Sequence, residues 1–167
     1  MATLTILEFP DPRLRAEAAP VDAFGPELAR LAADMLETMY AAQGIGLAAT
    51  QVGVAQRVFV MDVSENLDTP QVLVNPRILE KRGEQVFEEG CLSFPGVYAS
   101  VTRAGWIHVE CEDTDGHTTT REVDGIEAVC IQHELDHLDG KVFVDYLSPL
   151  KRAMLLKRME KQRRKAG

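Results

Sequence analysis

The sequence has few cysteines and no long apolar run. Its 167 residues include three cysteines, Cys91, Cys111 and Cys130, a sparse and odd number that excludes a disulfide-stapled scaffold and is typical of a reducing cytosol. No apolar run is long enough to cross a bilayer, and the first residues show no basic region followed by an apolar core. We therefore expect a cytoplasmic protein with no membrane segment and no export signal.

Internal repeats and low-complexity linkers are also absent from the sequence. Hydrophobic residues make up 46% of the chain and charged residues 26%, which is the balance of a globular protein and argues against wholesale disorder. We expect a single domain over residues 1–167, large enough to bury a substantial apolar core.

Basic residues are concentrated at the C-terminus. The net charge is −8, yet residues 151–167 contain eight Lys or Arg and one acid, a balance of +7 that leaves −15 for residues 1–150. Two interpretations are open. The tail contacts a polyanion, or it is a solvated helix end whose cations suit the negative end of the helix dipole.

The hydrophobic pattern predicts helices near both ends of the chain and strands between them. The helices are expected from Pro26 to a stop at Gly44, over residues 125–138, and over the basic tail, residues 148–167. The strands are expected over residues 57–63, 71–79, 106–112, 118–123 and, as a short one, 142–144. This order indicates an α+β fold and not a regular βαβ series.

The residues His133-Glu134-Leu135-Asp136-His137 form an HExxH pattern inside the second expected helix. Histidines four apart project from one face of a helix, so both can bind the same metal ion while Glu134 reaches a water molecule beside it. A metal-dependent hydrolase is therefore the leading hypothesis, although the pattern does not define which hydrolase.

A catalytic metal site with two histidines needs a third protein ligand. The metzincin continuation is excluded, because Phe143 stands where its third histidine would be. A downstream glutamate could only be Glu160, which lies in the basic tail. The remaining histidines, His108 and His117, are expected to be ordinary surface residues.

The third ligand could instead be a cysteine. Cys130 shares a helical face with His137, but seven residues separate them by about 10 Å of helix rise, so a core position is favoured. Cys111 lies on the apolar face of an alternating strand and is also expected in the core. Cys91 follows Glu88-Glu89-Gly90, where no apolar alternation explains a thiol, and is the favoured ligand.

The glycine-containing segment at residues 44–51 matches the dinucleotide fingerprint GxGxxA only superficially. That fingerprint follows a strand and opens a helix, whereas this segment follows an expected helix, so we expect no dinucleotide cofactor. Two interpretations remain. An extended ligand lies close to the backbone at Gly44 and Gly46 with Gln51 offering its carboxamide, or the segment is a flexible helix exit.

Three segments of the chain together resemble the peptide deformylase family. That family is marked by a GxGxAAxQ segment, an EGCLS segment and an HExxH helix, which stand here, in this order, at residues 44–51, 89–93 and 132–137. The similarity extends from Pro10-Asp11-Pro12 through residues 145–150, and the basic C-terminus is similar to that of the bacterial type I branch.

The resemblance implies antiparallel sheets packed around a central HExxH helix, with an N-terminal helix and a C-terminal helix. It implies that Cys91, His133 and His137 bind one divalent metal ion per chain, Fe(II) in the cell, with Ni, Co or Zn able to substitute. The implied reaction removes the N-formyl group from the N-terminal methionine of newly synthesised polypeptides and releases formate.

The resemblance also implies roles for residues around the metal. Glu134 is the expected general base, and the Gln51 side chain and the Leu92 backbone N–H are the expected donors to the oxyanion. The residues implied to bind substrate are Ile45, Gly46 and Gly90 along its backbone, and Ile45, Phe87, Val129 and His133 around the methionine side chain. Tyr98 departs from those type I relatives that carry a basic residue there, which should alter contacts with the second and third substrate residues.

An enzyme that acts on nascent chains benefits from proximity to the ribosome. We therefore expect the basic helix over residues 149–165 to contact ribosomal RNA, with Leu150, Met154 and Leu155 as the stripe that anchors it to the protein.

Two rival hypotheses come from other classes. One is a metallopeptidase that cuts internal peptide bonds, which the missing third histidine argues against. The other is a metal-stabilised binding module without turnover. Glu134→Ala discriminates between a catalytic and a structural metal site. If the site is catalytic, this change should abolish turnover and leave the metal bound; if the site is structural, it should have little effect.

Overall fold

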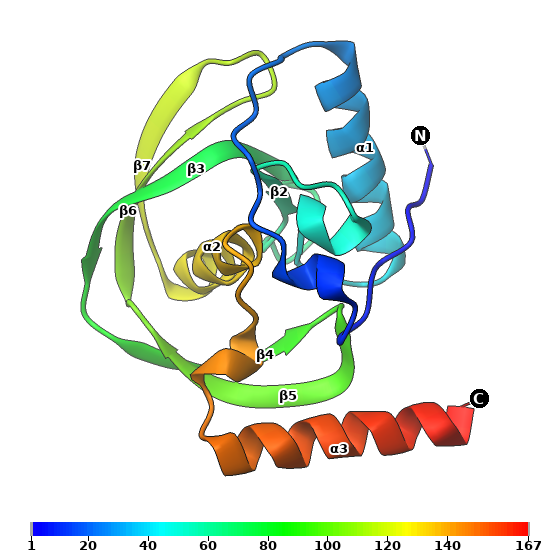
Figure 1. The fold of residues 1–167 in the computed structure, drawn as a ribbon. Helices are drawn as coiled ribbons and strands as arrows, with labels where there is room; N and C mark the ends of the chain where they lie inside the picture. Colours follow the sequence, from blue (N-terminus) through cyan, green and yellow to red (C-terminus); the bar gives the residue numbers. More distant parts are fainter. Residues whose placement is uncertain (1, 167) are drawn as a thin grey trace.

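The helix that carries the HExxH pattern, α2 (Gly125–Leu138), lies at the centre of the molecule between two antiparallel sheets (Figure 1). The computed structural model describes residues 2–166. Ten of the 14 residues of α2 are buried, so nearly every face of the helix is covered by another element. The predicted bounds of this helix, residues 125–138, are confirmed.

The larger sheet has five strands in the order β1-β2-β3-β6-β7, and every neighbouring pair is antiparallel. Its strands are β1 (Gly46–Ala48), β2 (Val58–Met61), β3 (Gln71–Arg82), β6 (Trp106–Glu112) and β7 (Thr118–Asp124). The prediction for 106–112 is confirmed. The strand expected at 71–79 continues to Arg82, because it stays paired with β6 as far as Trp106.

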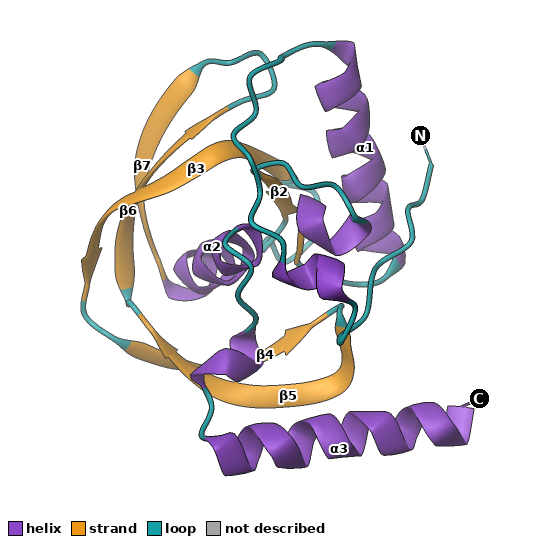
Figure 2. Ribbon diagram, in the orientation of Figure 1, coloured by secondary structure: helices purple, strands orange, loops and turns teal. Residues whose placement is uncertain are grey.

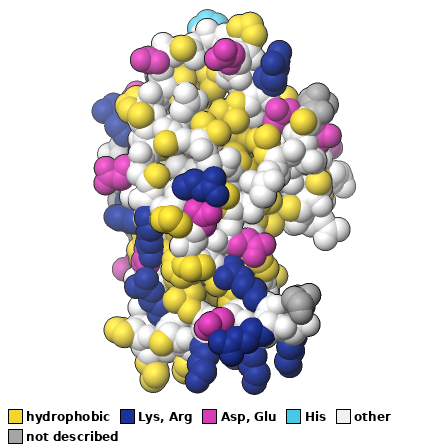
Figure 3. Space-filling view, turned by 45° about the vertical axis from the view of Figure 1, so that its right-hand side comes forward, with side chains coloured by type: hydrophobic (Ala, Val, Ile, Leu, Met, Phe, Trp, Pro, Cys, Tyr) yellow, Lys and Arg dark blue, Asp and Glu magenta, His cyan; other side chains and the backbone are white. Residues whose placement is uncertain are grey.

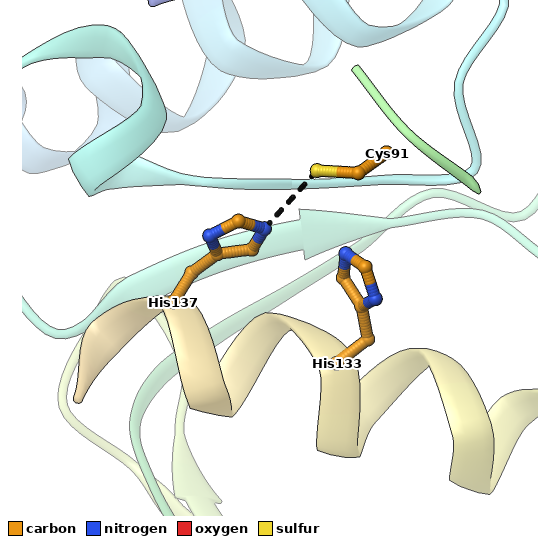
Figure 4. A group of neighbouring side chains, drawn as sticks. All are labelled: Cys91, His133 and His137. Carbon is orange, nitrogen blue, oxygen red and sulfur yellow. Dashed lines mark hydrogen bonds between the residues drawn. The ribbon is translucent and has the colours of Figure 1, made fainter. Parts of the chain in front are cut away.

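The smaller sheet was not predicted. It consists of β4 (Gln85–Cys91) and β5 (Phe94–Arg103), which pair antiparallel. The acidic residues and Gly90 in β4, and Pro95 and Gly96 in β5, have low strand propensity, so it is pairing that makes this stretch extended. The tight turn between the two strands places Cys91 at the end of β4, facing α2 (Figure 4).

The first long helix, α1 (Pro26–Ala41), begins at the predicted proline. Its end is closed by the Gly44 backbone N–H, which donates to the Met39 carbonyl at 3.0 Å, close to the predicted stop. Short 3-10 helices lie at η1 (Pro12–Arg15), η2 (Ala49–Val52) and η3 (Phe143–Tyr146). The short strand predicted at 142–144 is therefore wrong. The Asp145 carboxylate accepts from the Val142 N–H at 3.1 Å and favours a local turn there.

The C-terminal helix, α3 (Pro149–Ala166), packs along the outside of β5 (Figures 1 and 2). The residues that anchor it are Leu155, Leu156 and the buried Met159, which join a cluster built on Phe94 and Val97. The predicted anchoring stripe is therefore only partly right. Leu155 lies inward, whereas Leu150 and Met154 are 72% and 57% exposed and lie on the outer face.

The fold is thus the α+β arrangement expected from the sequence, with three α-helices and two antiparallel sheets among the described residues (Figure 2). Side chains of α2, β3 and β6 form one core cluster, and α1 packs over β1 and β2 to form a second. No helix within residues 2–166 combines the length and apolar character that a membrane span requires. Because α2 is held from several sides, the side chains it carries have little freedom to move.

Candidate active site

His133 and His137 project from the same face of α2, as their spacing predicts (Figure 4). Their ring centroids lie 5.0 Å apart and the ring planes meet at 67°. Both side chains are buried. Burial holds the pKa of His137 well below its ordinary value, so its imidazole is neutral, the form that binds a metal ion.

Cys91 approaches the two histidines from the end of β4 (Figure 4). Its Sγ lies 3.3 Å from His137 Nε2, and ligand atoms of Cys91, His133 and His137 all lie within 4.8 Å of one another. One thiol and two imidazoles at this separation fit a single transition-metal ion. The structure therefore brings the three predicted ligands together. The other cluster of acidic and histidine side chains among the described residues, Asp113, Asp115 and His117, lies on an exposed hairpin.

The other two cysteines are buried and are not among these three candidate ligands, as predicted. Cys111 is buried in the core cluster between the larger sheet and α2. Cys130 is buried on α2, and burial raises the pKa of its thiol well above the ordinary value, which disfavours the thiolate that a metal would bind. Its Sγ lies 3.8 Å from the Ile45 carbonyl oxygen.

Glu134 is a buried carboxyl group beside the two histidines. Burial raises its pKa to about 7, and its Oε1 has no hydrogen-bond partner within residues 2–166. A Cβ atom at Gly46 would lie 2.5 Å from Glu134 Oε2, so only glycine lets β1 run this close to the carboxylate. A buried carboxyl group with a pKa near neutrality suits proton transfer.

Gln51 reaches the same site from η2. Its side-chain oxygen accepts from the Ala48 N–H at 2.9 Å, which orients the carboxamide. The Nε2 group donates to Ser93 Oγ at 3.0 Å and lies 3.5 Å from Cys91 Sγ. The carboxamide N–H groups therefore face the cysteine, as the interpretation of Gln51 as a donor requires.

A cavity of about 490 Å³ opens beside these groups. The predicted residues that line it are Ile45, Gly46, Gln51, Phe87, Gly90, Cys91, Leu92, Val129, His133 and Glu134. Tyr98 also lines it, and its ring packs over Gly90, the residue that faces it across the β4–β5 pair. Within the glycine segment, residues 46–48 form the strand β1 and residues 49–51 belong to η2, and Gly44, Ile45 and Gly46 line the cavity. This arrangement favours the interpretation in which an extended ligand lies along the backbone over that of a helix exit.

Cys130 and Glu89 were not predicted as part of this site. Cys130 lines the cavity, a position indicated by its spacing of three residues before His133 on the helix. Glu89 Oε1 lies 2.8 Å from His133 Nδ1. Burial would raise the pKa of Glu89, but hydrogen bonds from His133 and Arg103 outweigh this and lower it. A carboxylate two residues before a ligating cysteine in the sequence was a usable signal for Glu89.

A thiol, two imidazoles and a buried carboxyl group around one cavity make a site of the kind found in metal-dependent hydrolases. Comparisons with known proteins define the family. The polypeptide deformylase family matches residues 3–153 of the chain. Peptide deformylase 2 of Xanthomonas campestris pv. campestris is 58% identical over 167 residues, with 98% of each chain covered.

Solved structures agree with this match. A peptide deformylase from Legionella pneumophila has a TM-score of 0.94 and 47% identity, covering 98% of this chain and 96% of that one. Peptide deformylase from Ehrlichia chaffeensis in complex with actinonin has a TM-score of 0.92 and 38% identity, covering 97% and 98%. The chain therefore belongs to the peptide deformylase family, whose members are metal-dependent hydrolases that remove the formyl group from N-formyl-methionyl peptides.

Proposed function

We propose that residues 1–167 form one catalytic domain in which Cys91, His133 and His137 hold a single divalent ion for deformylation of nascent polypeptides in the cytoplasm. The observation that carries this proposal is the meeting of one thiol and two imidazoles within 4.8 Å, beside a buried carboxyl group. A thiolate with two imidazoles favours Fe(II) or Zn(II) over Mg or Ca. Fe(II) is the proposed ion in the cell, with Ni, Co or Zn able to substitute.

When bound, the ion supplies a Lewis acid that lowers the pKa of water and polarises the formyl oxygen. Glu134 takes a proton from the attacking water and later returns it to the departing amine. Its enclosure against Gly46 keeps the carboxyl group at one place, and its raised pKa, about 7, lets it exchange a proton near neutral pH. The products are formate and a peptide with a free amino terminus.

The negative charge that develops on the formyl oxygen needs donors already in place. We assign this role to the Gln51 side chain and the Leu92 backbone N–H. The bond from the Ala48 N–H holds the Gln51 carboxamide with its N–H groups toward Cys91. Leu92 is held by its own side chain, which packs against Gly44.

The methionine side chain of the substrate is proposed to occupy the apolar part of the cavity. Phe87 and Val129 line this part together with Ile45. Gly90 and Gly46, which also line the cavity, expose backbone to an extended peptide, so the substrate can pair with the cavity walls as an added strand.

Formate release from a formyl-Met tripeptide tests this assignment. The protein is purified without oxygen and loaded with Fe(II) or Ni(II), because thiolate and Fe(II) are both open to oxidation. We expect turnover in the unaltered protein and none in Glu134→Ala, with one ion per chain in both. Turnover that survives in Glu134→Ala would remove Glu134 from the reaction. Absence of turnover with one ion bound would instead favour the binding-module hypothesis.

The outer face of α3 is proposed to contact ribosomal RNA. Lys and Arg side chains gather over this helix along the bottom of Figure 3. Lys157 and Lys161 are exposed there, on a chain whose net charge is −8. A basic helix on an acidic body is suited to orient the enzyme on a phosphate-rich surface.

Charge reversal tests this contact better than truncation, because Met159 on the inner face anchors α3 to the body. We expect Lys157→Glu/Lys161→Glu to weaken co-sedimentation with ribosomes and to reduce its salt dependence, while turnover of a small peptide stays unchanged. Lys81→Glu/Lys141→Glu, two exposed changes outside α3 with the same effect on net charge, is the matched control. Equal co-sedimentation of the α3 variant and the control would refute the contact.

A further inference from the structure

Arg103, at the end of β5, is a buried cation that lies outside the groups assigned above. Its side chain is 4% exposed and its guanidinium lies between two carboxylates. Nε donates to Glu89 Oε2 at 2.6 Å, Nη2 donates to Glu89 Oε1 at 2.9 Å, and Nη1 donates to Asp136 Oδ2 at 2.9 Å. Burial of a charge is costly unless it is paired and hydrogen-bonded, and here both partners are present.

The contact with Glu89 leads directly to His133. Glu89 Oε1 is hydrogen-bonded to both Arg103 Nη2 and His133 Nδ1, the latter at 2.8 Å. The planar fork of the guanidinium holds both carboxylate oxygens and so fixes the plane of the carboxylate. The carboxylate in turn fixes the rotation of the His133 ring, which leaves Nε2 to face Cys91 and His137.

The contact with Asp136 connects the same guanidinium directly to α2. Asp136 lies on α2 between the two histidines and also accepts from the Tyr146 hydroxyl at 2.7 Å. The Tyr146 ring lies 5.0 Å from the guanidinium carbon of Arg103. One guanidinium therefore ties β4, which carries Cys91, to the turn of α2 that carries both histidines.

We propose that Arg103 is a positioning residue for the metal centre. It keeps the Glu89 carboxylate in place, and through it keeps the His133 ring in the orientation that binds the ion. The proposal rests on the function proposed above, in which His133 is a ligand. Arg103 touches neither the cavity nor a reacting atom. Its loss should therefore weaken the hold on the metal and slow turnover, while substrate binding is preserved.

Arg103→Lys tests this role. Lysine keeps the charge but cannot span both oxygens of Glu89 in one plane. The matched control is Arg57→Lys, because Arg57 also braces α2, through Leu138 O and Asp139, and contacts neither Glu89 nor His133. The readouts are the rate at which EDTA removes Ni(II), the visible spectrum of the Co(II)-loaded protein, and kcat and KM for a formyl-Met tripeptide.

In Arg103→Lys we expect Ni(II) loss to EDTA to be roughly 10- to 100-fold faster, an altered Co(II) spectrum and a lower kcat, with KM within about twofold. The control should match the unaltered protein in all of these. The proposal is overturned if Arg103→Lys keeps the unaltered release rate and spectrum. It is also overturned if both lysine variants lose metal equally, because general loosening of α2 would then explain the effect.

Glu89→Gln keeps the inference testable if Arg103→Lys does not fold. In that variant the side-chain oxygen can still accept from His133, but the new NH2 group faces the guanidinium of Arg103 and cannot accept its hydrogen bond. Ni(II) loss should therefore again be faster than in the unaltered protein. Unchanged retention in Glu89→Gln would overturn the proposal. An unaltered protein that holds no Ni(II) and releases no formate would refute the proposed function first, and the role of Arg103 with it.

Discussion

Gly46→Ala is expected to disable the enzyme without removing the metal. The new Cβ would lie 2.5 Å from Glu134 Oε2 and 2.9 Å from Cys130 Sγ, where ordinary contacts are about 3.5 Å. Both neighbours are buried on α2, so the overlap must be relieved by moving the Glu134 carboxylate by about 1 Å. A misplacement of this size costs about 100-fold in rate. None of Cys91, His133 and His137 is among the atoms nearest to the added methyl group.

The assay is kcat for a formyl-Met tripeptide, measured together with the metal content of each protein. Gly105→Ala is the matched control, because its added Cβ meets nothing closer than a backbone oxygen at 3.5 Å, so activity should be unchanged. If Gly46→Ala keeps kcat within about twofold of the unaltered protein, Glu134 is not held where proton transfer needs it. If the variant loses its metal, the argument that the overlap is relieved at Glu134 and Cys130 without moving the metal ligands is wrong.

Three further predictions concern the cysteines, the C-terminal helix and acid stability. Cys91→Ala should lose the bound ion and all turnover, whereas Cys130→Ala should keep one ion per chain; equal metal contents would contradict the assignment. Met159→Ala should lower the free energy of unfolding by about 2 kcal/mol, because it leaves a cavity between α3 and β5. The exposed change Met154→Ala should lower it by less than about 0.5 kcal/mol, and urea denaturation measures both. Burial would raise the pKa of Asp62, but hydrogen bonds from nearby hydroxyl and amide groups outweigh it and lower that pKa below its ordinary 3.8. The stabilisation by Asp62 is therefore complete above pH 3.8 and is lost as the pH falls through the lowered pKa. Asp62→Asn should therefore lose less free energy of unfolding on acidification than the unaltered protein does. Urea unfolding above pH 3.8 and below the lowered pKa measures this difference.

Elements with local sequence signals were predicted closely. The bounds of α2 and β6 are confirmed, because the first has helical periodicity and the second a clean alternation. The pair β4–β5 could not be found in this way, since its strands depend on each other and not on their own propensity. The inner face of α3 was mispredicted for a related reason. Only the position of β5 decides that Met159 lies inward and Met154 outward.

The candidate site was predictable as far as the motifs reach. The motifs and their order in the sequence predicted Cys91, His133, His137 and Glu134 as site residues, and the structure places them together. The bracing by Arg103 was not predictable, because its contacts span 14 and 33 residues and no pattern relates an arginine on one strand to two acids elsewhere. Such contacts become visible only once the packing of β5 against α2 is known.

The central claim is that one ion is held by Cys91, His133 and His137. Anomalous diffraction at the nickel edge, from crystals of the Ni(II)-loaded protein, tests it most directly. The account predicts a single strong peak within coordination distance of the cysteine sulfur and of one nitrogen from each histidine. A principal peak anywhere else, such as at the exposed cluster of Asp113, Asp115 and His117, would contradict it.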